Sequence, residues 1–153
     1  IFASKATGYA FDIGMQAGFL AERLVLGAAL QNLGTMNDLD VLATDLPRTL
    51  RAGLAVSPLR LRAADGATTL DLMLSAEASH LLPDEATRVH VGAAATLLGL
   101  VTLRAGYLTN DTLRDLTFGG GLVYAGFVFD YAYLPFESGF EGPGHVLTLQ
   151  YLW

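Results

Sequence analysis

The sequence predicts an all-β protein: an antiparallel transmembrane β-barrel of the outer-membrane type, with about nine strands in 153 residues. Three observations lead to this prediction. The chain is 52% hydrophobic and 16% charged, against roughly 25% charged residues in soluble domains. Its longest apolar stretch, residues 91–101, is far shorter than the roughly 18 to 20 residues of a membrane-spanning helix. Its apolar residues instead recur at every second position, which is the period of a β-strand.

The alternation is clearest near the C-terminus. Phe127, Phe129 and Tyr131 share one face of an extended segment, and Asp130 takes the opposite face. The same period, followed along the whole chain, predicts strands at about residues 8–17, 23–33, 49–57, 67–78, 87–97, 100–108, 114–124, 126–134 and 144–153. These strands form a single β-barrel domain over residues 1–153, or the C-terminal part of a larger barrel.

Each predicted strand has one large apolar face, and its other face is small or polar. In order along the chain, the apolar faces carry Phe11, Ile13 and Met15; Leu24, Leu26 and Leu30; Leu50, Leu54 and Val56; Leu70, Leu72 and Leu74; Val89 and Val91; Val101, Leu103 and Tyr107; Phe127, Phe129 and Tyr131; and Leu147, Leu149 and Tyr151. The strand at 114–124 is predicted from its small face, which carries Thr117, Gly119 and Gly121.

Two architectures share this pattern, a soluble sandwich and a membrane barrel. The predicted strands run for about nine to eleven residues, the length of a tilted transmembrane strand, whereas soluble strands average about five to six. The polar faces hold glycine, alanine, threonine and isolated charges, which suits a crowded hydrated lumen. Connections also alternate between short ones, near residues 18–22, 98–99 and 125, and longer ones. These features favour the membrane barrel.

Aromatic residues are predicted to form two girdles at the membrane interfaces. One girdle comprises Phe19, Tyr124, Phe127, Tyr151 and Trp153, and the other comprises Tyr9, Tyr107, Tyr133 and Phe136. Between Phe19 and Tyr107 the chain has no aromatic residue. The second to fifth strands therefore form a wall of leucine, alanine and valine. This wall has two interpretations: local drift in composition, or contact with a protein partner or with further strands.

Six segments, YAFDIG (9–14), LGAALQNLG (26–34), LPRTLRAG (46–53), LRAGY (103–107), FGGGL (118–122) and FDYAY (129–133), resemble in sequence and order the C-terminal part of the PorV/PorQ family of bacterial outer-membrane proteins. That family is related in fold to the FadL-type fatty-acid transporters. The resemblance implies a bacterial outer-membrane location and either of two roles. One is passage of hydrophobic or small solutes; the other is a structural or cargo-binding role in an assembly such as type IX secretion.

The C-terminal residues Leu147, Leu149, Tyr151 and Trp153 are similar to the signal by which outer-membrane barrels are recognised for insertion. Two features depart from that signal. Trp153 stands where phenylalanine is commoner, and His145 occupies a position that is usually apolar. Nine strands are also an odd number, whereas bacterial single-chain barrels have even numbers. We therefore expect a chain that lacks its N-terminal strands, or a barrel that other strands close.

The candidate site consists of charged residues predicted to face the lumen. Two interpretations fit them: a solute path or head-group site, and a ladder of cross-strand pairs that fills the lumen and fixes the register. Glu77 and His90 suggest acid–base chemistry. No positioned nucleophile accompanies them, so no enzymatic activity is predicted, and an outer-membrane lipase is the enzyme alternative. The candidates are Asp12, Arg51, Asp71, Glu77, Arg88, His90, Arg104 and Asp130.

Partners are limited by the charge of the chain. The formal net charge is −6, which argues against nucleic acid because phosphate binding needs clustered Lys and Arg. The lipid bilayer of the outer membrane is the expected surroundings. A protein partner is a further possibility along the second to fifth strands. No cofactor or metal is expected, and the absence of cysteine excludes thiolate-ligated metal centres.

Overall fold

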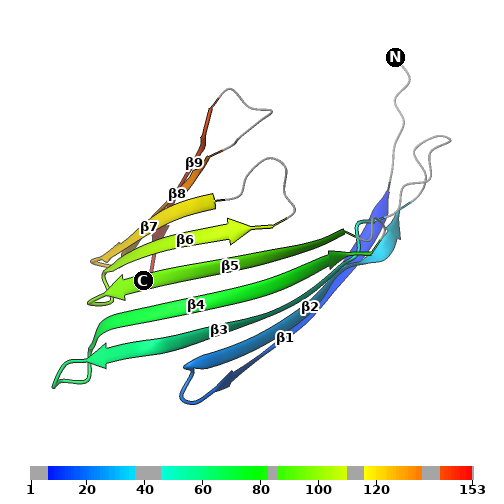
Figure 1. Cartoon of the computed structure of the whole chain (residues 1–153). Coiled ribbons are helices and arrows are strands. Elements are labelled where there is room, and N and C mark those ends of the chain that lie inside the picture. The colour runs from blue at the N-terminus through cyan, green and yellow to red at the C-terminus, as the bar shows by residue number, and fades with distance from the viewer. Residues whose placement is uncertain (1–6, 37–45, 83–85, 110–115, 136–141, 153) are drawn as a thin grey trace.

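The computed structural model describes residues 7–36, 46–82, 86–109, 116–135 and 142–152. These residues form one antiparallel sheet in which each strand pairs with its neighbours in the sequence (Figure 1). The strands are β1 (Gly8–Phe19), β2 (Leu24–Met36), β3 (Thr49–Arg62), β4 (Thr68–Leu81), β5 (Ala86–Leu97), β6 (Val101–Leu108), β7 (Leu116–Tyr124), β8 (Phe127–Leu134) and β9 (Gly144–Tyr151). The prediction of an antiparallel all-β fold with nine strands is confirmed.

The largest difference from the predicted boundaries lies in the hairpin of β3 and β4. We predicted that the third strand ends at residue 57, but β3 continues to Arg62 across a register shift between Val56 and Leu59. Pro58 lies at this irregularity, where its missing N–H costs no ladder hydrogen bond. Because the shift inserts an extra residue, it reverses which positions of β3 face each side of the sheet.

Four of the eight connections between successive strands are turns at one end of the sheet, where the C-terminal end of β9 also lies (Figure 1). They span residues 20–23, 63–67, 98–100 and 125–126. In the last of them, Ala125 and Gly126 have φ angles of 50° and 82°. Two successive positive φ angles are the signature of a type I′ hairpin turn, whose twist matches that of the strands. We call the end of the sheet that carries these four turns the turn end. The opposite end, where residues 37–48, 82–85, 109–115 and 135–143 join the strands, is the loop end.

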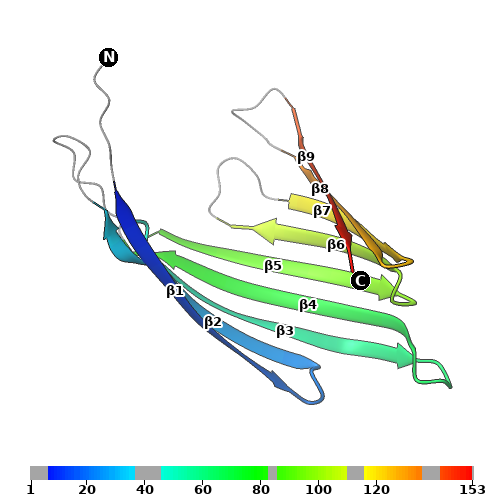
Figure 2. The same ribbon diagram turned by 180° about the vertical axis from the view of Figure 1, so that it is seen from behind.

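The sheet is curled, so that β7–β9 lie out of the plane of β2–β5 (Figures 1 and 2). One line of directly paired residues crosses all nine strands. It runs from Phe19, the last residue of β1, to His145, the second residue of β9. Measured against the ends of the strands, this line moves from the turn end of β1 to the loop end of β9, an average displacement of about one residue per strand. With about 3.4 Å per residue and about 4.8 Å between strands, it corresponds to a tilt of roughly 35°.

The described residues have almost no buried core. Among them, Leu108 is the buried hydrophobic residue and Ser57 the buried polar one. Large apolar side chains from every strand are exposed instead, including Met15, Leu54 and Leu147. The sheet therefore places polar residues on one face and apolar residues on the other, and the described residues form no second layer that covers the apolar face. The described residues also form no helix with the length and hydropathy needed to cross a membrane.

Candidate functional site

The register places the predicted charged residues on one face of the sheet, which we call the inner face. Directly paired residues lie on the same side of an antiparallel sheet. Glu77 pairs with His90, and Ser79 pairs with both Arg51 and Arg88. Asp71, Arg104 and Asp130 fall on the same face by the same rule, opposite Thr96, Ala94 and Gly121 respectively. Seven of the eight candidates therefore share one surface by direct register.

Asp12, the eighth candidate, has a local structural contact. It lies at the register shift between Phe11 and Ile13, where β2 contains an additional residue. Its Oδ1 atom accepts a hydrogen bond of 2.8 Å from the backbone N–H of Asn32, which has a φ angle of 59°. The Asn32 side chain in turn donates to the carbonyl oxygen of Pro47 at 2.8 Å. Asp12 thus stabilises a β-bulge in β2.

Three arginine–carboxylate pairs cross the inner face. Arg51 donates to Glu77 Oε1 from Nη2 at 2.6 Å and from Nε at 3.0 Å. Arg104 Nη1 lies 2.6 Å from Asp130 Oδ1. The third pair joins the Nε atom of Arg60 to Oδ2 of Asp71 at 2.8 Å. Cross-strand pairs of this kind fix the register of a sheet, which is one of the two interpretations proposed for these residues.

Arg60 was not among the predicted candidates, because residues 58–66 were predicted to be a connection. Without the register shift, Arg60 falls in phase with Leu50 and Leu54 and faces the apolar side. The shift turns it to the inner face, opposite Asp71. Its pair is the most enclosed of the three, with side-chain exposures of 19% and 22%. Ser57 and Pro58 were the sequence signal for this irregularity.

The pair between Arg104 and Asp130 reaches across an intervening strand, from β6 to β8. It passes over Gly121 of β7, where an added Cβ atom would lie 2.8 Å from Asp130 Oδ1 and 3.3 Å from Arg104 Nη2. A side chain at this position would therefore displace the pair. This close approach explains why Gly121, the last glycine of the run in β7, has no side chain.

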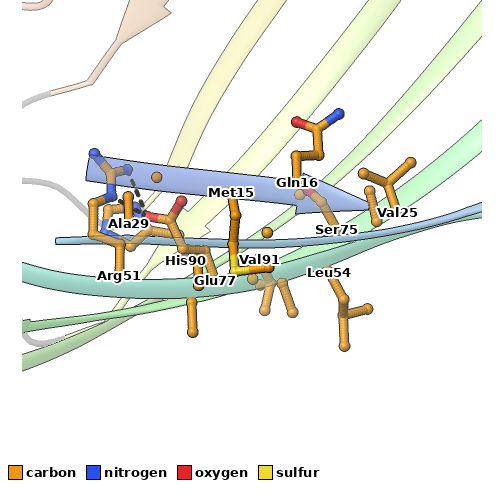
Figure 3. A pocket seen from close by; sticks show the side chains of 18 of the residues that line it. Met15, Gln16, Val25, Ala29, Arg51, Leu54, Ser75, Glu77, His90 and Val91 are labelled. Carbon is orange, nitrogen blue, oxygen red and sulfur yellow. Dashed lines mark hydrogen bonds and ion pairs between the residues drawn. The ribbon is translucent and has the colours of Figure 1, made fainter. Parts of the chain in front are cut away.

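A groove of about 730 Å³ lies over β1–β5 (Figure 3). Its floor is built of small inner-face residues, among them Gly27 and Gly53, which pair directly with each other. Arg51 and Glu77 stand at one side of it, and Gln16 rises on the other (Figure 3). In the same view Leu54 points away to the opposite side of the sheet. The groove combines a small, partly apolar floor with polar walls.

A second hollow of about 320 Å³ lies over β6–β9 on the inner face. Arg104 and Asp130 line it together with Thr117 and Thr148. Both hollows therefore lie on the polar side of the sheet. Among the described residues, no cluster of three or more histidine, aspartate or glutamate side chains is placed to hold a metal ion.

The opposite, outer face carries the apolar half of the alternation. Tyr131 and His145 meet near the loop end, where the tyrosine hydroxyl and His145 Nδ1 are 2.7 Å apart, and His80 contacts Thr87 in the same way at 2.8 Å. Arg62 lies at a second register shift, next to the turn of residues 63–67, and the pairing assigns it to neither face. Among the other described strand residues, those that the register assigns to the outer face include no Asp, Glu, Lys or Arg. Polar groups on this face are mostly near the ends of the strands.

The described aromatic residues of the two predicted girdles lie near the ends of the strands, whereas Phe11, Phe129 and Tyr131 of the outer face lie between the ends. Phe127 and Tyr151 lie side by side at the turn end, with ring centroids 4.8 Å apart. Tyr9 and Tyr133 lie near the loop end, next to the first residue of β1 and the last residue of β8. Leu147 and Leu149 of the proposed insertion signal share the outer face of β9 with Tyr151. Trp153 and Phe136 lie outside the described residues.

Comparison of the chain with protein-family models, with curated proteins and with solved structures found no match.

Proposed function

We propose that this chain is a non-enzymatic outer-membrane β-barrel protein, or the C-terminal part of one, and that hydrophobic or small solutes pass along its inner face. The distribution of charge carries the proposal. Arg51, Arg60, Arg104 and their carboxylate partners stand on the inner face. With the exception of Arg62, which lies at a register shift at the end of β3, the described strands carry none of these residue types on the outer face. An apolar outer surface and a polar interior are the pattern of a membrane barrel.

Three further features support this proposal. The tilt of roughly 35° falls at the lower limit of the roughly 35–45° seen in transmembrane barrels. Turns of two to five residues join the strands at one end of the sheet, and three of the four connections at the other end are longer, with seven to twelve residues, as in outer-membrane proteins. The described sheet has almost no core, so that its outer face needs another apolar environment, and a lipid bilayer supplies one.

Membrane insertion is tested by washing the membranes of producing cells with alkaline carbonate. We expect the chain to remain in the pellet, because an integral barrel is held by its whole apolar band. Release into the wash would contradict the proposed location. The test concerns location alone and leaves the question of solute passage to a second experiment.

Solute passage is tested by swelling of lipid vesicles that contain the purified protein. We expect small solutes to enter faster than into protein-free vesicles. Gly27→Trp should lower this rate because it fills the groove, where an added Cβ atom meets no neighbour closer than 3.8 Å. The matched control Ala28→Trp places the same ring on the outer face. Equal loss of flux in both variants would contradict passage along the inner face.

A second candidate function, a structural or cargo-binding partner in an outer-membrane assembly, is favoured by the outer wall of β2–β5. Ala28, Ala52 and Ala78 pair directly in a row across β2, β3 and β4. Small residues allow close packing between membrane-embedded segments. Replacing Ala52 with tryptophan should then dissociate a larger complex in detergent, whereas it leaves an isolated barrel unchanged. A particle of the same size for both proteins would contradict the partner role.

A further inference from the structure

Each of the two outermost strands has a neighbour on one side only, among the residues that the structure describes. Their outer-face side chains show the missing neighbour directly. Met15 of β1 and Leu147 of β9 are 75% and 76% exposed, whereas Leu26 of β2 and Leu54 of β3 are 42% and 46% exposed. The difference arises because an interior side chain is flanked by strands on both sides. Both edges also carry backbone N–H and C=O groups that no adjacent strand of the sheet pairs.

The direction of the strands restricts what can complete these edges. All eight neighbouring pairs are antiparallel, so that β1 and β9 run in the same direction, from the loop end to the turn end. Direct pairing of β1 with β9 within this chain would therefore be parallel. The same holds for a second copy that stands in the membrane in the same orientation, because its β1 would meet the first copy's β9.

An inverted second copy would allow antiparallel pairing at both edges, but it would place its loops on the wrong side of the membrane. Turned upside down with its apolar face still outward, it would pair β1 with β1 and β9 with β9 in antiparallel fashion. Its long connections would then lie on the opposite side of the membrane from those of the first copy. Barrels of this type keep short turns on one side and long loops on the other. A second copy therefore does not fit the edges in either orientation.

We propose that β1 and β9 bind an odd number of additional antiparallel β-strands that are not supplied by this sheet or by a copy of it. The proposal rests on the proposed membrane location, because lipid offers no hydrogen-bonding partner to the edge groups. The fitting polypeptide alternates apolar and polar residues, so that its apolar side continues the surface of Ile13 and Leu149. Its polar side continues that of Gln16 and Gln150.

The absence of cysteine from the chain makes a disulfide test direct. One variant carries Ala17→Cys and Leu149→Cys, which lie on the outer faces of the two edge strands, each two residues before the last residue of its strand. The control carries Leu122→Cys and Phe129→Cys, which are directly paired in β7 and β8. After mild oxidation in the native membrane, we expect a disulfide in the control only. An edge disulfide within one chain, or between two chains, would overturn the proposal.

Two readouts complete the test. A dimer formed by the single variant Ile13→Cys would show an inverted or sideways second copy, and would equally overturn the proposal. With nitroxide labels on the two introduced cysteines of the edge variant, we expect one narrow distance distribution with a mean of at least about 10 Å, because at least one strand at about 4.8 Å spacing stands between the two edges. A broad distribution, or a separation of a single strand spacing, contradicts the proposal.

The carbonate wash separates this proposal from the one on which it rests. Chain that is released into the wash contradicts the membrane location itself. Chain that stays in the pellet but forms an edge disulfide contradicts only the completion of the sheet by other strands.

Discussion

A single arginine on the outer face of β4 should destabilise the protein far more than an arginine on the inner face of β3. Ala76 lies near the middle of β4 on the outer face, directly opposite Leu54 and Val91. Ala55 lies near the middle of β3 on the inner face, opposite Ser75. The two residues are identical in type and similar in depth. Ala76→Arg and Ala55→Arg therefore differ mainly in the side of the sheet that receives the charge.

The expected magnitude follows from the cost of a cation on the lipid-facing side of a barrel. Near the bilayer midplane arginine costs about 2–4 kcal/mol. At about 1.36 kcal/mol per factor of ten, this cost lowers the folding equilibrium constant roughly 30- to 900-fold. Ala55 lines the groove of about 730 Å³, where a guanidinium has space beside polar walls. We expect Ala55→Arg to change the free energy of unfolding by about 0.5 kcal/mol or less.

The assay is urea unfolding of the protein in lipid vesicles, followed by its altered mobility on gels when unheated. Wild type and Ala55→Arg should unfold at nearly the same urea concentration, and Ala76→Arg at a clearly lower one. Equal midpoints for the two variants would refute the assignment of outer and inner faces. A larger loss in Ala55→Arg would show that the inner face is the one in contact with lipid.

Two further predictions concern the ion pairs of the inner face. Gly121→Ala should lower the free energy of unfolding by roughly 1–2 kcal/mol, because its Cβ atom displaces Asp130. Gly120→Ala should be nearly neutral, because its Cβ atom meets its nearest neighbour at 3.7 Å. Unfolding midpoints compare the two variants, and equal losses would contradict the role of Gly121. Asp71→Asn should lower the free energy of unfolding by roughly 2–3 kcal/mol and Glu77→Gln by at most about 1 kcal/mol, because Asp71 belongs to the more enclosed ion pair. The reverse order of unfolding midpoints would contradict this ranking.

Strand positions could be predicted from the sequence because each strand separates apolar from polar residues at a period of two. Residues 126–134 and 100–108 agree with β8 and β6 to within a residue at each end. The charged candidates share a face for the same reason, since a residue two positions away in a strand returns to the same side. Neither result required knowledge of long-range contacts.

The residues that the sequence did not place depend on local breaks in that period. Arg60 was missed because the register shift near Pro58 changes the phase of β3, and a fixed period of two cannot follow it. The pair between Arg104 and Asp130 spans two strand spacings, so that it depends on a gap at Gly121 that cross-strand rules do not include. Asp12 was grouped with the lumen residues, although its carboxylate bonds the backbone of Asn32.

The most direct test of the central claim is the accessibility of alternate residues along β3 to lipid. Single cysteines at positions 50 to 56 carry nitroxide labels in membrane-embedded protein, and their collision rates with oxygen, which dissolves in lipid, are measured by paramagnetic resonance. We expect high rates at Leu50, Ala52, Leu54 and Val56 and low rates at Arg51, Gly53 and Ala55. A profile without a period of two, or one with the opposite phase, would contradict the central claim.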